Sequence, residues 1–178
     1  MAVTGFGGLM VLGGMAGDMA FAGLCSLIVL ASLGFLMVNF PPAKLFMGDS
    51  GSTLMGFAMT GLSILGWQRG IYPFWAPLVL FSPFWVDASI TIVKRLWRGE
   101  KIWQAHREHY YQRWVLAGFS HRFVVLVEYG LMVFCLIVVL AWQYGFAGLN
   151  ESGLILLWML VCGGLVVMSE RYLNSLAR

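Results

Sequence analysis

Charge is the scarcest property of this sequence. Only 11% of the 178 residues are charged, whereas 60% are hydrophobic and the mean hydropathy is +0.82. A soluble domain carries roughly a quarter charged residues, so the polar surface is too small to cover a globule of this length in water. The sequence therefore excludes a soluble enzyme and predicts an all-α polytopic membrane protein. No nucleic-acid partner is expected.

Cysteine is sparse, and the first residues lack the features of a leader signal. Cys25, Cys135 and Cys162 lie in apolar stretches without metal-ligand spacing, which favours small buried side chains over disulfide or zinc roles. Residues 1–8 lack the basic stretch that precedes the apolar run of a signal peptide. This start is more typical of the interior of a larger membrane protein.

Long apolar runs are present in place of charge. They fall at about 1–17, 19–38, 53–67, 71–93, 123–142 and 153–169, and a span needs about 20 residues. We expect about six transmembrane helices in a single membrane domain over 1–178. The first is short enough for a half-length or re-entrant helix, and the third should recruit flanking residues. Gly13 and Gly17 are expected to allow close helix contact.

The basic residues indicate the orientation of these helices. Seven of the eleven lie between the fourth and fifth spans: Lys94, Arg95, Arg98, Lys101, Arg107, Arg113 and Arg122. Lys44, Arg171 and Arg178 fall on the same side if six helices alternate, and only Arg69 falls opposite. Because Lys and Arg favour the cytoplasmic side, loops 39–52 and 94–122 are both predicted to be cytoplasmic.

The first of these loops, 39–52, combines prolines, glycines, one lysine and one acid. Pro41 and Pro42 end the preceding helix, and Gly48 and Gly51 flank Asp49, which gives its backbone unusual freedom. An acid at a helix start suits a magnesium ion, which takes carboxylates, phosphate oxygens and waters.

Lys44 is suited to meet a phosphate as a point charge. Ser50 and Ser52 are expected to cap the following helix. The alternative is a plain helix-breaking loop in which Asp49 only caps that helix.

The second loop holds two histidines three residues apart, His106 and His109, among arginines and tyrosines. If this stretch is helical, His106, His109 and Arg113 share a face. Such a cluster can bind the phosphates of a nucleotide sugar through Arg or His. The alternative is a basic juxtamembrane helix on anionic lipid.

Asp87 is a candidate of a different kind, because it lies inside the fourth apolar run. Intramembrane acids are costly and indicate function. Its seven-residue distance from Lys94 places it roughly 10 Å below the cytoplasmic end, where it could face a cytoplasmic cleft. The alternative is a buried partner for a basic residue or a hydroxyl. Glu128 has the same ambiguity.

Together these residues resemble the polyprenyl-phosphate N-acetylhexosamine-1-phosphate transferases, glycosyl transferase family 4. Residues 39–52, continued by 53–57, are similar to the cytoplasmic signature of that family. Asp87, residues 94–102 and the His-Arg-x-His segment up to Gly118 resemble its later cytoplasmic loop. Tyr111 and Gln112 replace the paired histidines that usually follow the residue matched by His109. This form of the motif is closest to the subgroup that starts O-antigen or related polysaccharides. It puts a muramyl-pentapeptide substrate in doubt.

The resemblance implies transfer of a sugar 1-phosphate from a UDP-sugar donor to undecaprenyl phosphate in the bacterial inner (plasma) membrane. It implies Asp49 and His109 as catalytic residues, with Asp49 as a ligand of Mg²⁺, or alternatively Mn²⁺. The implied substrate-binding residues are Asn39, Lys44, His106, Arg107 and Arg113, and Asp87 is the intramembrane acid.

The likeness covers only the C-terminal half of a ten- or eleven-helix transferase. The family's adjacent aspartates and its Asp-Gly-x-Asp-Gly pattern do not occur, and Asp18 stands alone. We therefore expect a fragment that is incomplete without an N-terminal half, with a homodimer as another arrangement. A non-catalytic scaffold subunit that binds lipid phosphate is the main alternative, and a small transporter using Asp87 and Glu128 is a weaker one.

Overall fold

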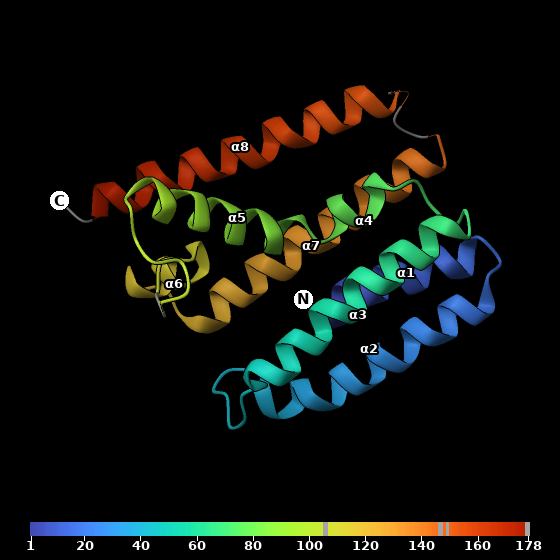
Figure 1. The fold of residues 1–178 in the computed structure, drawn as a ribbon, viewed down its shortest axis with the longest axis horizontal. Coiled ribbons are helices and arrows are strands. Elements are labelled where there is room, and N and C mark those ends of the chain that lie inside the picture. The colour runs from blue at the N-terminus through green and yellow to red at the C-terminus, as the bar shows by residue number, and fades with distance from the viewer. Residues whose placement is uncertain (105–106, 146–147, 149, 177–178) are drawn as a thin grey trace.

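The computed structural model describes residues 1–104, 107–145, 148 and 150–176, and its regular elements in that part of the chain are all helices. They are α1 (Ala2–Met15), α2 (Met19–Asn39), α3 (Gly48–Gln68), α4 (Trp75–Leu80), α5 (Ser82–Trp97), α6 (Tyr110–Leu116), α7 (His121–Gln143) and α8 (Glu151–Leu176). Figure 1 shows α1, α2 and α3 on one side of the bundle and α5 and α8 on the other, with α7 running between them.

In the part of the chain that the structure describes, three helical stretches are long and apolar enough to cross a membrane: α2, α7 and residues 151–173 of α8. The chain is therefore an integral membrane protein. The other expected spans are also helical, with different bounds. The first is the 14-residue α1, short as anticipated. The third, α3, recruits its N-terminal flank and begins at Gly48.

The expected span 71–93 is divided into α4 and α5 at Phe81. The second residue of α5 is Pro83, which has no N–H to donate to the helix before it. Two carbonyls of α4 are satisfied by side chains instead: the Ser82 hydroxyl donates to the carbonyl of Val79 at 2.7 Å, and the Trp85 indole donates to that of Leu78 at 2.8 Å. The break between α4 and α5 therefore leaves few backbone carbonyls without a hydrogen-bond donor.

The core lies where α1, α2, α4 and α7 meet. Its fully buried side chains include Phe6 and Leu9 of α1, Phe21 of α2, Leu80 of α4 and Val139 of α7. Cys25 and Cys135 are free thiols buried in this region, and Cys162 is free and half-buried, as expected of small apolar side chains.

Small residues allow α1 to approach its neighbours. A Cβ on Gly13 would lie 2.6 Å from the Phe21 ring, and one on Gly5 would lie 2.1 Å from the Phe81 ring. The prediction for Gly13 is thus confirmed. The prediction for Gly17 is wrong, because this residue has open space around it and serves the turn before α2 with φ +81°.

Candidate functional site

The loop between α2 and α3 is folded back onto the end of α2. The amides of Lys44 and Leu45 donate to the carbonyl of Val38 at 2.9 and 3.3 Å. The side-chain amide of Asn39 donates to the carbonyl of Leu45 at 2.8 Å. Asn39 therefore shapes this loop, while the Lys44 side chain is exposed.

Asp49 is exposed in the first turn of α3. A carboxylate at this position is favoured by the positive end of the helix dipole. The expected caps are wrong: α3 begins at Gly48, so Ser50 and Ser52 lie inside the helix and Met47 is the N-cap, without a side-chain hydrogen bond. The Ser52 hydroxyl instead donates to the carbonyl of Asp49 at 3.0 Å. Gly48, where α3 begins, has φ +70°, a backbone conformation that glycine adopts without steric cost.

The second predicted segment is not a continuous helix. Arg107 is exposed in irregular backbone, and His109 is the N-cap of α6. Helical backbone starts only at Tyr110, so the conditional expectation of one helical face shared by His106, His109 and Arg113 is not met. His106 itself lies outside the described residues.

His109 lies beside Asp87 of α5. Its Nδ1 is 3.5 Å from Asp87 Oδ1, and the same oxygen accepts hydrogen bonds from the Tyr110 amide at 2.9 Å and the Thr91 hydroxyl at 3.2 Å. The Asp87 side chain is only 13% exposed. The imidazole also stacks on Tyr111, with ring centroids 5.8 Å apart. Asp87 thus ties the His109 segment to α5, as the partner alternative anticipated.

A largely apolar cavity of about 460 Å³ adjoins this junction, between α5, α6, α7 and α8. Asp87 and Glu128 are the acids in its lining. The two acids that the sequence singled out inside apolar runs therefore share one cavity.

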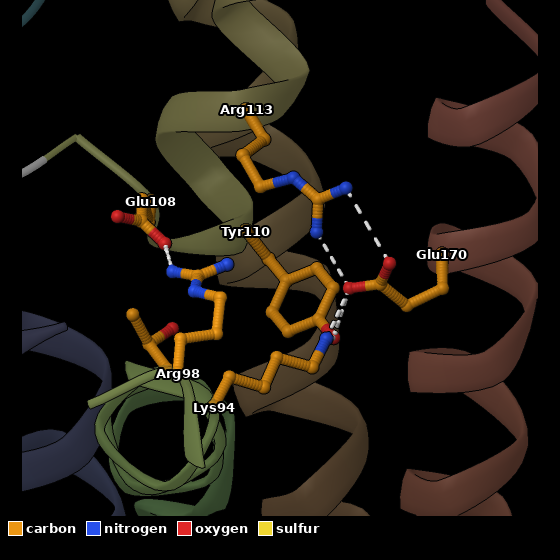
Figure 2. Close-up of a pocket in the computed structure, with 7 residues that line it drawn as sticks. Lys94, Arg98, Glu108, Tyr110, Arg113 and Glu170 are labelled. Carbon is orange, nitrogen blue, oxygen red and sulfur yellow. Dashed lines mark hydrogen bonds and ion pairs between the residues drawn. The ribbon is translucent and has the colours of Figure 1, made fainter. Parts of the chain in front are cut away.

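A third group of residues gathers around the Tyr110 side chain (Figure 2). Glu170 of α8 accepts hydrogen bonds from Tyr110 Oη at 2.8 Å and from Arg113 at 2.5 and 3.4 Å. Lys94 donates to the same carboxylate and to Tyr110 Oη, the latter at 2.7 Å. These residues line a cavity of about 410 Å³ together with Thr91, Arg98 and Glu108.

The protonation states in this group follow from its contacts. Burial lowers the pKa of Lys94, but its hydrogen bonds to Glu170 and Tyr110 outweigh that effect and raise it. Burial raises the pKa of the Tyr110 phenol, and the Glu170 carboxylate raises it further against the opposing effect of Lys94. Near neutral pH, Tyr110 is therefore a neutral donor between an ammonium and a carboxylate.

Glu170 and Arg95 are functional candidates that sequence reasoning did not select. Arg95 is buried and donates to the carbonyl of Lys101 at 2.9 Å, which shapes the segment after α5. The available signal for Glu170 was an acid at the end of an apolar run. Its pairing with Lys94, 76 residues away, depends on how α8 packs.

The two predicted loops lie at the same end of the bundle. Figure 1 shows the α2–α3 loop and α6 both at its left end. The Arg122 guanidinium donates from Nε to the carbonyl of Pro41 at 3.0 Å, which joins the start of α7 to the first loop. Asp18 is at the other end, paired with Arg69 at 3.0 Å. Among the described residues, no three His, Cys, Asp or Glu side chains come together that could hold a metal ion by protein ligands alone.

Comparison with known proteins decides the family. Residues 1–67, which include the whole α2–α3 loop, match the model of glycosyl transferase family 4. A Bacillus subtilis protein named a probable undecaprenyl-phosphate N-acetylglucosaminyl 1-phosphate transferase is 30% identical over 131 residues, which are 72% of this chain and 37% of that protein. The chain belongs to glycosyl transferase family 4.

Other relatives of this family member carry related names. A phospho-N-acetylmuramoyl-pentapeptide-transferase of Synechococcus is 37% identical over 94 residues, 53% of this chain and 24% of the relative. A decaprenyl-phosphate N-acetylglucosaminephosphotransferase of Mycobacterium tuberculosis is 34% identical over 113 residues, 56% and 28% of the two chains. The chain thus spans about a third or less of these relatives' length. No solved structure matches it.

Proposed function

We propose that this chain is part of a transferase that moves an N-acetylhexosamine 1-phosphate, or a derivative, from a UDP-sugar to undecaprenyl phosphate. The reaction would start a cell-surface polysaccharide such as O-antigen, in the bacterial inner membrane with loops 39–52 and 94–122 in the cytoplasm. One observation carries the proposal. Exposed Lys44 and Asp49 lie in the α2–α3 loop and at the start of α3, within the family-matched segment, and this loop is at the same end of the bundle as α6, which His109 caps.

Phosphoryl transfer depends mainly on alignment and charge neutralisation, with little covalent work by the protein. In our proposal Lys44 contacts a phosphate, while Arg107 and His109 contact the diphosphate or sugar of the donor. Asp87 holds the His109 imidazole through Nδ1. Asn39 contributes by fixing the loop that presents Lys44, and His106 and Arg113 complete the proposed donor-binding set.

A divalent ion fits this site through one protein ligand. Magnesium is usually held by one or two carboxylates together with substrate phosphates and waters, and Asp49 is an exposed carboxylate at a helix start. Asp49 would hold Mg²⁺, or Mn²⁺, when the donor diphosphate supplies the phosphate oxygens. The ion would neutralise the charge that develops during transfer.

The test is UMP release from a UDP-N-acetylhexosamine in membranes that contain the protein and undecaprenyl phosphate. Asp49→Asn should lower the rate about 100-fold or more, the size of losing one transition-state contact. Glu151→Gln is the matched control because Glu151 is also an exposed acid in the first turn of a helix, and it should leave the rate unchanged. Undiminished release by Asp49→Asn would refute the role of Asp49. Absence of release from the wild-type chain would refute its activity as a separate protein.

A further inference from the structure

Tyr110, the first residue of α6, is bound from two sides. Its backbone N–H donates to Asp87 of α5 at 2.9 Å. Its hydroxyl donates to Glu170 of α8 at 2.8 Å. The start of α6 is therefore fixed between two other helices, and His109 is the residue immediately before this fixed point.

Arg113 extends the contact with α8. Tyr110 and Arg113 are three residues apart and share one face of α6, and both reach Glu170 (Figure 2). The same carboxylate also receives the Lys94 ammonium of α5. One acid on α8 therefore joins α5 to α6 through Lys94, Tyr110 and Arg113, and Tyr110 is the residue that follows His109.

The size of α6 makes its position depend on such contacts. It has seven residues, and helices this short are not stable without tertiary packing. If Glu170 lost its charge, the Lys94 and Arg113 cations, which both contact its Oε1 and both lie near the Tyr110 ring, would be left close together without a shared anion. Repulsion between them would displace the start of α6.

We propose that Glu170 is a positioning residue for His109. It holds Tyr110 and Arg113, these fix the start of α6, and the His109 imidazole is thereby kept beside Asp87. This inference rests on the proposed function of His109 in donor binding. Its geometry can nevertheless be tested without any activity, because the chain contains only three histidines, at 106, 109 and 121.

The experiment records imidazole NMR signals of the ¹⁵N-histidine-labelled chain in lipid nanodiscs, with His109 assigned by His109→Gln. Glu170→Gln should shift the His109 signals and leave those of His121, at the start of α7, in place. Glu151→Gln removes a charge from the other end of α8 and should shift neither. Unchanged His109 signals in folded Glu170→Gln would overturn the proposal.

If Glu170→Gln does not fold, its His121 signals will change together with those of His109. In that case a second variant tests the proposal. Glu170→Asp keeps the charge but shortens the side chain by one methylene, and it should shift His109 by a smaller amount. Unchanged His109 signals in this variant would overturn the proposal.

UMP release separates the positioning role from the proposed function. Glu170→Gln should lower kcat about 100-fold, the loss that a misplacement near 1 Å produces. Wild-type protein that releases no UMP, but whose His109 signals respond to Glu170→Gln, would refute activity of the chain as a separate protein and support the positioning role. Undiminished kcat in Glu170→Gln would overturn the positioning role even if wild-type transfer is confirmed.

Discussion

Arg95 offers a quantitative test of how the segment after α5 is held. Its side chain is 5% exposed and donates from one nitrogen to the carbonyl of Lys101 at 2.9 Å. It also lies 3.3 Å from Glu108 and 3.5 Å from Glu100, two acids that are each more than a third exposed. Arg95→Met would keep most of the buried side-chain volume and remove all three polar contacts.

The expected loss follows from these contacts. A hydrogen bond from a charged donor contributes about 1.5–3 kcal/mol. Ion pairs with partly exposed acids add at most about 1 kcal/mol each, and here both acids keep Arg98 as a partner. A total of about 3 kcal/mol corresponds to roughly a 100-fold larger population in which the Lys101 segment is open.

Trypsin cleavage after Lys101, followed by mass spectrometry in detergent micelles, measures that population when reclosing is faster than cleavage. Arg95→Met should raise the cleavage rate about 100-fold. Arg98→Met is the matched control, because Arg98 pairs with the same two acids but is 51% exposed, and it should raise the rate only slightly. An equal or larger increase in Arg98→Met would refute the argument that burial makes Arg95 the principal anchor.

Two further predictions concern the other end of the bundle. Asp18→Asn keeps a side-chain cap on α2 but removes the ion pair with Arg69. The amide of Phe21 and the Arg69 guanidinium hold the pKa of Asp18 below its usual value. Above about pH 4, the wild-type protein should therefore have a higher melting temperature than Asp18→Asn. This difference should shrink as the pH falls through the lowered pKa of Asp18 in the folded protein. A difference in melting temperature that stays constant from pH 7 to pH 2 would contradict the prediction. Gly66→Ala would place a Cβ 2.2 Å from the buried Tyr72 hydroxyl, which should cost about 1–3 kcal/mol of unfolding free energy in mixed micelles. Gly61→Ala, in the same helix with open space around it, should be neutral or slightly stabilising, and equal losses in the two variants would show that the contact with Tyr72 is unimportant.

The long helices were accessible from sequence because α2, α7 and α8 satisfy the length and apolarity that a lipid bilayer requires. The division of run 71–93 was not predicted, although Pro77 and Pro83 on either side of Phe81 disfavour a continuous helix. What makes the break tolerable is a set of side-chain donors, Ser82 and Trp85, whose targets are known only once α4 and α5 are folded.

The candidate site could likewise be predicted from the sequence only in part. The irregular stretch 40–47 is local, so Pro41 and Pro42 indicated directly that the preceding helix ends there, whereas residues 48–52 of the predicted loop lie inside α3. The partners of Asp87 and Arg113 are 23 and 57 residues away, and single-sequence patterns do not specify such pairs. The prediction that His106, His109 and Arg113 share one helical face was not met for a related reason: His109 lies beside Asp87, which is distant in the sequence, and it precedes the first helical residue of α6.

The contact made by Glu170 gives α8 a fixed register. The apolar side chains of its membrane-crossing stretch are mostly not buried against the other described helices, so exchanging one of them for another should cost little. The number of residues before Glu170 cannot be changed so freely. One residue inserted after Gly163 would turn Glu170 by about 100° around the helix axis, and an insertion of four would restore the face but move the carboxylate by roughly one helical turn. Substitutions among the apolar residues of α8 should therefore be tolerated, whereas insertions or deletions before Glu170 should not.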